Sequence, residues 1–391
     1  MSSALFSPIT MRGLTLANRI VISPMSQNSA VDGLPRPWHA MHLGAMAVSG
    51  AGLVIVEATA VEAEGRITPD DLGLYNDAQE TALTRLLADI RTYADAPIGI
   101  QLGHAGRKAS TRSTGDGRFR TRVLSPEDGG WQTWGPSAIA FDEGWPQPRV
   151  LDRAAMQRVR DAYRAAAGRA ARSGFDLLEL HGAHGYLLSQ FLSPLSNRRT
   201  DAYGGSLANR MRFPLECVAA VREVWPGDRP LGMRFNGADY ADGGFTADEA
   251  AVYAQALTAA GVDYVTASAG MVTPECRFPY VEPGYLMPLA EPLRRDGVTV
   301  MGVGMILSPH QAESIVRSGQ ADMVALARAA LDDPRWPWHA AVALGEEPPI
   351  PSRYRYVLPR KWPGHAHVRR FESPQPADAA QSPSPTGAPV Q

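Results

Sequence analysis

Short apolar runs alternate with longer segments of helical period along most of the chain. Each run has four or five mostly apolar residues, as expected of a strand that is buried on both faces of a helix-covered parallel sheet. The eight runs are 20–23, 53–57, 98–102, 177–181, 231–235, 264–268, 298–302 and 323–326. Eight successive strand–helix units predict an α/β fold, a (β/α)8 TIM barrel built as a single domain.

Capping residues predict where several of the intervening helices begin. Asp152 precedes a long segment with apolar side chains at helical spacing, so it is suited to cap that helix. Thr246 with Glu249, and Ser308 with Gln311, each fit a capping box. A dinucleotide-binding sheet is disfavoured, because no G-x-G-x-x-G motif follows the first strand.

Residues 103–151, after the third strand, form an unusually long connection. Connections of this length are usually functional lids or disordered inserts. Trp131, Trp134 and Trp145 favour packing over disorder, because disordered segments are poor in aromatic residues. We therefore predict an extended, packed loop at this point of the barrel.

The C-terminal part of the chain lies outside the repeat. The barrel is expected to occupy residues 1–345, followed by an extension over residues 346–372. Within the extension, residues 352–356 are basic and aromatic, which fits a subunit interface and equally fits a solvated arm. Residues 373–391 have five prolines and no aromatic residue, so this Pro/Ala/Ser tail is predicted to be disordered.

Composition narrows the class of protein. The chain has 391 residues and a formal net charge of -2, so it lacks the basic excess of a general nucleic-acid binder. It has two cysteines, Cys217 and Cys276, without CxxC spacing, which argues against a disulfide framework or an iron–sulfur cluster. No run of 18 apolar residues and no targeting signal is found. We expect a cytoplasmic protein that binds neither nucleic acid nor membrane.

Two imidazoles and a phenol follow the fourth strand. His181, His184 and Tyr186 stand where this strand ends, and ligands of α/β barrels bind at that edge. Two imidazole donors aimed at one oxygen atom would stabilise negative charge that develops on it. A second interpretation is that the two histidines bind a metal ion. Zinc would need a third protein ligand, and Glu179 keeps this possibility open. The third reading is a pair of structural histidines.

Several motifs occur in order and resemble one known family. They are Ser23-Pro24-Met25, Val56-Glu57-Ala58, the segment 101–108, the two-histidine segment 180–187, the segment 191–201, Tyr203-Gly204-Gly205-Ser206 and Asn209-Arg210. From about Leu5 to His339 the chain resembles the Old Yellow Enzyme family of NADH:flavin oxidoreductases. It is most similar to the thermophilic-like branch of ene-reductases, which includes xenobiotic reductase A.

This resemblance implies an enzyme with non-covalently bound FMN. NADPH or NADH would reduce the flavin, and an activated alkene such as an enone, a maleimide or a nitroalkene would then take the hydride in a ping-pong cycle. His181 and His184 would hold the carbonyl oxygen of the alkene, and Tyr186 would donate the proton to its α-carbon. A phenol suits this role because it is protonated at neutral pH.

The resemblance also implies which residues bind FMN. Those near the ring are Ser23, Pro24, Met25, Ser26, Ala58 and Gln101, each close to the end of one of the first three strands. Arg234, in the fifth strand, would place a permanent charge beside the flavin and stabilise its reduced anion. Gly304, Ala327 and Arg328, after strands seven and eight, would bind the phosphate.

Three positions depart from the pattern of the branch. Ser26 replaces a cysteine that tunes the flavin, and a serine hydroxyl does not ionise near neutrality. Asn28 replaces a substrate-binding tyrosine, so the pocket is expected to be wider there. Ala327 replaces a glycine, which backbone donation tolerates if its φ stays negative. Ile67 matches the pocket wall of the family, so it and Asn28 are expected substrate contacts.

Two other functions stay open beside a homodimeric or higher homo-oligomeric ene-reductase. One is a metal-dependent barrel hydrolase or lyase that uses His181 and His184. The other is a flavin-binding sensor or scaffold with little turnover. A colourless protein that loses its activity to a chelator would favour the former.

Overall fold

A closed barrel of eight parallel strands forms the centre of the computed structural model, which describes residues 2–113 and 123–367. The strands run in the order β10-β9-β8-β5-β4-β3-β12-β11, and a parallel bridge between Val265 and Val300 joins the two ends of the sheet. Their bounds are β3 (Ile20–Ile22), β4 (Leu53–Ala60), β5 (Ile98–Gly103), β8 (Leu177–Gly182), β9 (Leu231–Ala238), β10 (Tyr264–Ala269), β11 (Met301–Gly302) and β12 (Met323–Leu326). All eight predicted strands, and hence the TIM barrel, are confirmed.

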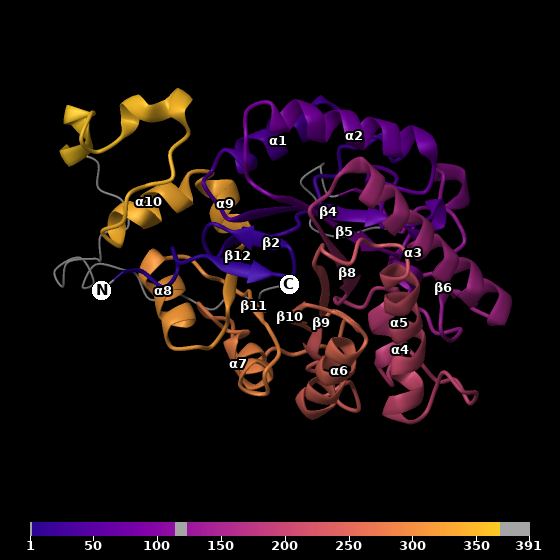
Figure 1. The fold of residues 1–391 in the computed structure, drawn as a ribbon. Helices are drawn as coiled ribbons and strands as arrows, with labels where there is room; N and C mark the ends of the chain where they lie inside the picture. The colour runs from indigo at the N-terminus through magenta and orange to yellow at the C-terminus, as the bar shows by residue number, and fades with distance from the viewer. Residues whose placement is uncertain (1, 114–122, 368–391) are drawn as a thin grey trace.

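Helices surround the strands on the outside of the barrel (Figure 1). Their bounds are α1 (Pro37–Ala47), α2 (Asp77–Arg91), α3 (Arg153–Ser173), α4 (Leu187–Leu192), α5 (Leu207–Arg222), α6 (Ala247–Ala259), α7 (Met287–Arg295), α8 (Pro309–Arg317), α9 (Arg328–Asp332) and α10 (Trp336–Ala343). A hairpin of β1 (Ile9–Met11) and β2 (Leu14–Leu16) contacts the segment before β9, where the Gly13 amide donates to the Asp228 carbonyl over 2.8 Å. The hairpin therefore covers the end of the barrel opposite to the strand mouths.

The predicted helix starts are confirmed at their caps, with one difference. The carboxylate of Asp152 accepts from the amide of the third residue of α3, and Thr246 with Glu249 forms a complete capping box at α6. Ser308 caps α8, but the Gln311 side chain accepts from the amide of Leu307 rather than from that of Ser308. The predicted capping box at Ser308 is therefore wrong in its second hydrogen bond, which involves the amide one residue earlier in the chain.

The long connection after β5 is packed onto the molecule through its described residues 103–113 and 123–151. It includes β6 (Trp134–Gly135) and β7 (Arg149–Val150). The indole of Trp131 donates to the Glu64 carbonyl over 2.9 Å, and that of Trp134 donates to the Glu64 carboxylate over 2.5 Å. The predicted packing is thus confirmed for this part, while residues 114–122 lie outside the described chain.

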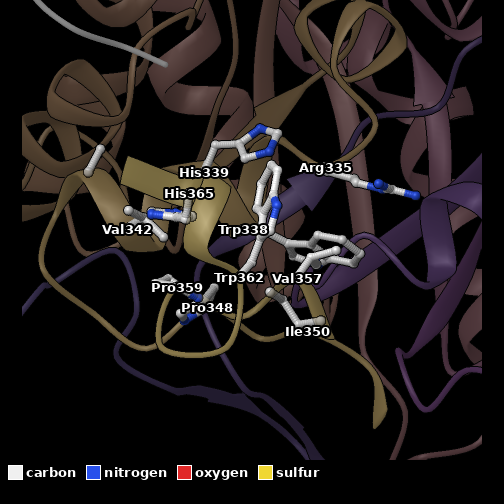
Figure 2. A pocket seen from close by; sticks show the side chains of 11 residues that line it. Arg335, Trp338, His339, Val342, Pro348, Ile350, Val357, Pro359, Trp362 and His365 are labelled. Carbon is white, nitrogen blue, oxygen red and sulfur yellow. The ribbon is translucent and has the colours of Figure 1, made fainter. Parts of the chain in front are cut away.

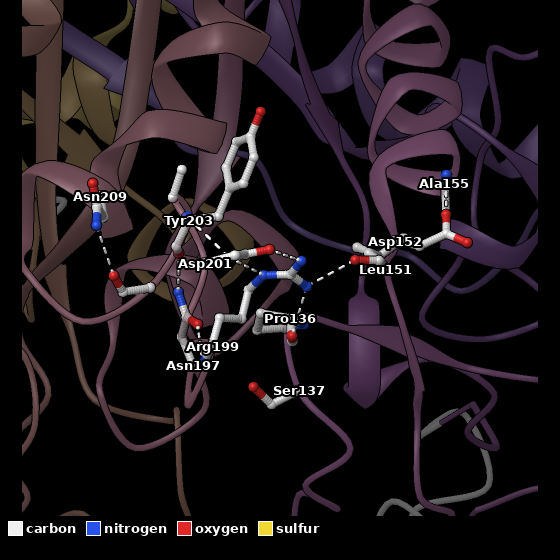
Figure 3. Close-up of polar contacts among 12 residues, drawn as sticks. Pro136, Ser137, Leu151, Asp152, Ala155, Asn197, Arg199, Asp201, Tyr203 and Asn209 are labelled. Atoms are coloured by element: carbon white, nitrogen blue, oxygen red, sulfur yellow. Dashed lines mark hydrogen bonds and ion pairs between the residues drawn. The ribbon is translucent and has the colours of Figure 1, made fainter.

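Arg199, between α4 and α5, fastens this connection to the barrel (Figure 3). Its guanidinium donates to the Pro136 carbonyl over 3.0 Å and to the Leu151 carbonyl over 2.7 Å. Asp201 holds the other edge of the guanidinium in a bidentate pair with distances of 3.0 and 2.6 Å. One cation therefore joins both ends of the 136–151 segment to the strand-mouth side of the molecule.

The extension beyond the barrel forms short 3-10 turns, η5 (Ser352–Val357) and η6 (Pro363–His367). The side chains of Trp338, Ile350 and Trp362 help to line a cavity of about 190 Å³ between α10 and this extension (Figure 2). None of the predicted site residues lines it. The predicted tail 373–391 lies outside the described residues. Among the described helices, none combines the length and the apolar character needed to cross a bilayer.

Replacing Arg199 with alanine should loosen the connection after β5. The change removes charge-assisted bonds to two backbone carbonyls, so the free energy of unfolding should fall by about 1.5–3 kcal/mol. Urea denaturation measures this loss, and limited proteolysis should cut first within 103–151. Arg198→Ala is the matched control, since Arg198 is exposed beside it. Equal stability of the two variants would contradict the role given to Arg199.

Candidate active site

Three aromatic rings meet at the carboxyl end of β8. His181 is the penultimate residue of this strand, His184 lies in the turn that follows it, and Tyr186 caps α4. The ring centroids of His181 and His184 are 5.1 Å apart, those of His181 and Tyr186 are 4.9 Å apart, and both pairs are nearly perpendicular. The residues that the motif predicted are therefore brought together at the mouth of the barrel.

His181 is a neutral imidazole with a defined tautomer. Its Nδ1 accepts from the Ala183 amide over 3.3 Å, so the hydrogen-bond pattern assigns the ring proton to Nε2. Burial lowers the pKa of His181 well below its usual value, and the charges of Arg234 and Lys108 lower it further. A neutral ring with Nε2–H is a hydrogen-bond donor at every pH near neutrality.

His184 is held in a left-handed backbone conformation with a φ of 58°. Its amide donates to the side-chain oxygen of Asn236 over 2.9 Å, and its carbonyl accepts from the Lys108 ammonium over 2.9 Å. These two side chains offset the cost of a non-glycine residue in this region. The ring Nε2 lies 2.6 Å from the Ser268 hydroxyl, and burial lowers the pKa of His184 well below its usual value.

Tyr186 faces a small pocket that Ala58 and Ile67 also line, together with His181 and Asp71. Burial raises the pKa of the Tyr186 phenol, and the Asp71 carboxylate raises it further. The phenol is thus protonated throughout the neutral range. Ile67 lies in the wall of this pocket, and its contact with a substrate stays a prediction.

Lys108 is a site residue that the sequence reasoning missed. Its ammonium donates to the carbonyls of His184 and Met271, each over 2.9 Å, and both of those residues have a positive φ. It lies 5.3 Å from the centre of the Tyr186 ring. Burial and, to a smaller extent, the charge of Arg107 lower the pKa of Lys108 to about 7. A signal was available, because the chain has only one other lysine, Lys361, among 38 basic residues.

Arg234 has a buried guanidinium nitrogen without a hydrogen-bond acceptor among the described residues. It projects from β9 to the mouth of the barrel, where Nη1 lies 3.4 Å from the Ser23 hydroxyl. Its Nε is buried and has no hydrogen-bond partner among the described residues. A buried guanidinium N–H without a partner costs free energy, so the site fits a ligand that presents an acceptor here.

A cavity of about 570 Å³ begins at Arg234 and reaches the loops after β11 and β12. Predicted site residues on its wall are His184, Arg234, Gly304, Ala327 and Arg328. Its volume lies within the range of about 300–1,000 Å³ that is typical of cofactor sites. Ala327 has a φ of −116°, which meets the condition set by its departure from glycine. The cavity and the unpartnered Nε together fit a flavin with a phosphate-bearing chain.

The remaining predicted residues lie at the ends of the first three strands. Gln101 is buried in β5, and Ser23 follows β3 directly, with Pro24, Met25 and Ser26 in the loop beyond it. None of these five residues lines the two site cavities described above. Their contact with the cofactor stays a prediction.

Asn28 has an intramolecular role that the sequence did not predict. Its amide donates to the Asp71 carboxylate over 3.0 Å and to the Thr68 hydroxyl over 3.3 Å. These bonds tie the loop after β3 to the segment that carries Ile67. A substrate contact by Asn28 stays a prediction.

The metal-site alternative finds no support in the structure. Glu179, the carboxylate that left it open, hydrogen-bonds within the barrel to Gln101, Tyr264 and Thr266. Over residues 2–113 and 123–367, no cluster of three His, Cys, Asp or Glu side chains suited to a metal ion is found.

Comparison with known proteins decides the family. The model of the NADH:flavin oxidoreductase / NADH oxidase family matches residues 4–347. The chain belongs to this family. A relative called NADPH dehydrogenase, from Geobacillus sp. (strain WCH70), is 45% identical over 348 residues, covering 88% of this chain and 96% of the relative. The NADPH dehydrogenase of Geobacillus thermodenitrificans (strain NG80-2) is 43% identical, covering 90% and 98%.

A solved structure agrees with this assignment. Morphinone reductase in complex with tetrahydroNAD has 28% identity and a TM-score of 0.69, over 89% of this chain and 93% of that chain. The Old Yellow Enzyme resemblance is confirmed, and the protein is an NAD(P)H-dependent flavin oxidoreductase with FMN as its cofactor.

The two lysines make the state of Lys108 directly measurable. In protein labelled with ¹³C at the lysine Cε, NMR should give two resonances, and the one that Lys108→Met removes should titrate near pH 7. Its folded pKa lies below the ordinary value of 10.5, so the native state holds fewer protons than the unfolded state between pH 7 and 10.5. The stability contributed by this group therefore rises with pH across that window. A Lys108 resonance that stays charged at pH 9 would refute this assignment.

Proposed function

We propose that the protein is an ene-reductase that reduces the C=C bond of α,β-unsaturated carbonyl compounds with NADPH or NADH. The observation that carries the proposal is the cluster of two neutral imidazoles and a protonated phenol beside the cavity at Arg234. When bound, FMN supplies hydride transfer, first from the nicotinamide and then to the β-carbon of the alkene. Enones are the proposed substrates, with maleimides and nitroalkenes in the same chemical class.

The imidazoles bind and polarise the carbonyl of the substrate. His181 presents Nε2–H, because its Nδ1 is already an acceptor for the Ala183 amide. Asn236 and Lys108 fix the backbone of His184, and its ring Nε2 lies 2.6 Å from the Ser268 hydroxyl, so Nδ1 is the ring nitrogen that is left for the substrate. Donors that are already oriented stabilise the negative charge that develops on the oxygen without reorganisation during the reaction.

Tyr186 supplies the proton that completes the reduction. Its raised pKa makes it a weak acid that keeps its proton until a basic carbon forms nearby. Ala58 and Ile67 line the same pocket and give the phenol a partly apolar surrounding. The proton is thus delivered to the α-carbon, and solvent restores it to the phenol after product leaves.

The predicted assembly and cellular setting belong to the same proposal. A homodimer would place residues 352–356 against a neighbouring subunit, and the described part of this segment carries exposed aromatic side chains at Tyr354 and Tyr356. We also propose a cytoplasmic location, where nicotinamide is supplied by metabolism.

Steady-state kinetics test the shared site. If nicotinamide and enone bind by turns, initial rates measured at several cyclohexenone concentrations should give parallel lines in double-reciprocal plots. The purified protein should be yellow, and anaerobic NADPH or NADH should bleach it before cyclohexenone restores the colour. Converging lines, or bleached protein that cyclohexenone does not reoxidise, would contradict the proposal.

Tyr186→Phe separates proton donation from flavin reduction. The rate of alkene reduction should fall by about 10²–10⁴-fold, the usual contribution of a general acid. The rate of flavin reduction by nicotinamide should change little, because that step needs no proton from the phenol. Stopped-flow absorbance measures both half-reactions, with Tyr93→Phe, an exposed tyrosine, as the control. Equal slowing of both half-reactions would refute the role of Tyr186.

A further inference from the structure

Glu179 is a carboxylate in the interior of the barrel with no part in the chemistry above. It lies in β8 two residues before His181, so both side chains point to the same face of the strand. It is 1% exposed. Acidic side chains are almost never fully buried unless they are paired, so a barrel interior that keeps one requires a partner for it.

Three donors from two other strands converge on this carboxylate. Gln101 in β5 donates through its side-chain Nε2 to Oε1 over 2.7 Å. Tyr264 and Thr266 in β10 donate through their hydroxyls to Oε2 over 3.0 and 3.2 Å. Glycine at position 232 makes this possible, because a Cβ there would lie 2.1 Å from the Tyr264 ring. An ionised carboxylate can accept from all three of these donors at once, so the contacts fit the charged form of Glu179.

The negative charge of Glu179 stabilises the positive charge of Arg234. Register pairs place Glu179 beside Gly232, two residues before Arg234 on β9. Burial lowers the pKa of Arg234, and the charge of Glu179 opposes that fall. Burial likewise raises the pKa of Glu179, and the charge of Arg234 opposes that rise. The two charges therefore stabilise each other inside the barrel.

We propose that Glu179 is a positioning residue that sets the reduction potential and the affinity of FMN through Gln101 and Arg234. The inference rests on the proposed placement of the flavin beside those two residues. It goes beyond that placement by assigning the electrostatic balance of the site to a side chain in the layer beneath it.

The first effect is on the orientation of Gln101. A terminal amide has one end that donates and one that accepts, and the contact with Glu179 uses the donor end. The carbonyl Oε1 is therefore the end that remains for a ligand. This matches the flavin, whose pyrimidine ring offers an N–H donor between two carbonyls.

The second effect is on charge. Arg234 favours the reduced flavin anion, and Glu179 beneath it reduces that preference. Removing the negative charge while keeping the shape should therefore make the bound flavin easier to reduce.

Glu179→Gln tests both effects in the FMN-loaded enzyme. The midpoint potential is measured by anaerobic titration against a dye of known potential. It should rise by about 30 mV or more, which corresponds to a tenfold or greater change in the two-electron equilibrium constant. The FMN dissociation constant should rise as well, because a glutamine at position 179 cannot accept from all three donors. Glu249→Gln is the control, since Glu249 pairs with Arg210 near α6.

A second variant covers the case in which Glu179→Gln does not fold. Tyr264→Phe keeps the ring and the charge of Glu179 but removes a hydroxyl dipole that partly offsets this charge, so the midpoint potential should fall instead of rising. Unchanged potential in either folded variant, even with lower thermal stability, would overturn the inference and indicate a purely structural carboxylate.

The outcome is separable from that of the proposed function. A shifted potential in a protein that does not reduce cyclohexenone would leave this inference standing and refute the ene-reductase. If the parent enzyme reduces cyclohexenone but the midpoint potential of Glu179→Gln is unchanged, this inference is refuted and the proposed function stands.

Discussion

Charge buried inside a closed barrel is the constraint on which this structure depends. Eight parallel strands enclose a packed interior that has no edge, so each ionised side chain within it needs a partner. Glu179 and Arg234 meet this condition through hydrogen bonds and through each other. The imidazoles meet it differently, because burial and the neighbouring cations keep both of them neutral. The chemistry at the carboxyl ends of the strands therefore depends on two charged groups, Glu179 and Arg234, and on two neutral imidazoles.

The strands and the starts of three helices, α3, α6 and α8, could be predicted from the sequence because they depend on local patterns. A strand covered on both faces leaves an apolar run, and a cap needs only residues three apart. The seventh strand shows the limit, since residues 298–302 were predicted and only Met301–Gly302 form β11, while Val300 makes an isolated bridge. Its neighbours on the sheet decide which of its residues pair, and a single run carries no information about them.

The site divides in the same way. His181, His184 and Tyr186 were predicted because all three lie within six consecutive residues, and the structure places the His181 ring about 5 Å from each of the other two rings, at 5.1 and 4.9 Å between centroids. Glu179 and Lys108 were not, because their partners come from strands and loops far along the chain. The contact between Asn28 and Asp71 is of the same kind, because the two residues are 43 positions apart in the chain. Long-range pairing of polar groups is therefore the part of the site that local reasoning does not reach.

The loops around the mouth are fastened mainly through their backbones. Lys108 binds the carbonyls of His184 and Met271, Arg107 binds that of Val272, and Arg199 binds two more. A carbonyl is present whatever side chain its residue carries, so these anchors survive substitutions in the loops themselves. Loop sequence and loop position are thereby uncoupled. The side chains of the segments that carry these carbonyls can diverge, in evolution or by design, while Arg107, Lys108 and Arg199 keep the backbones of those segments in place.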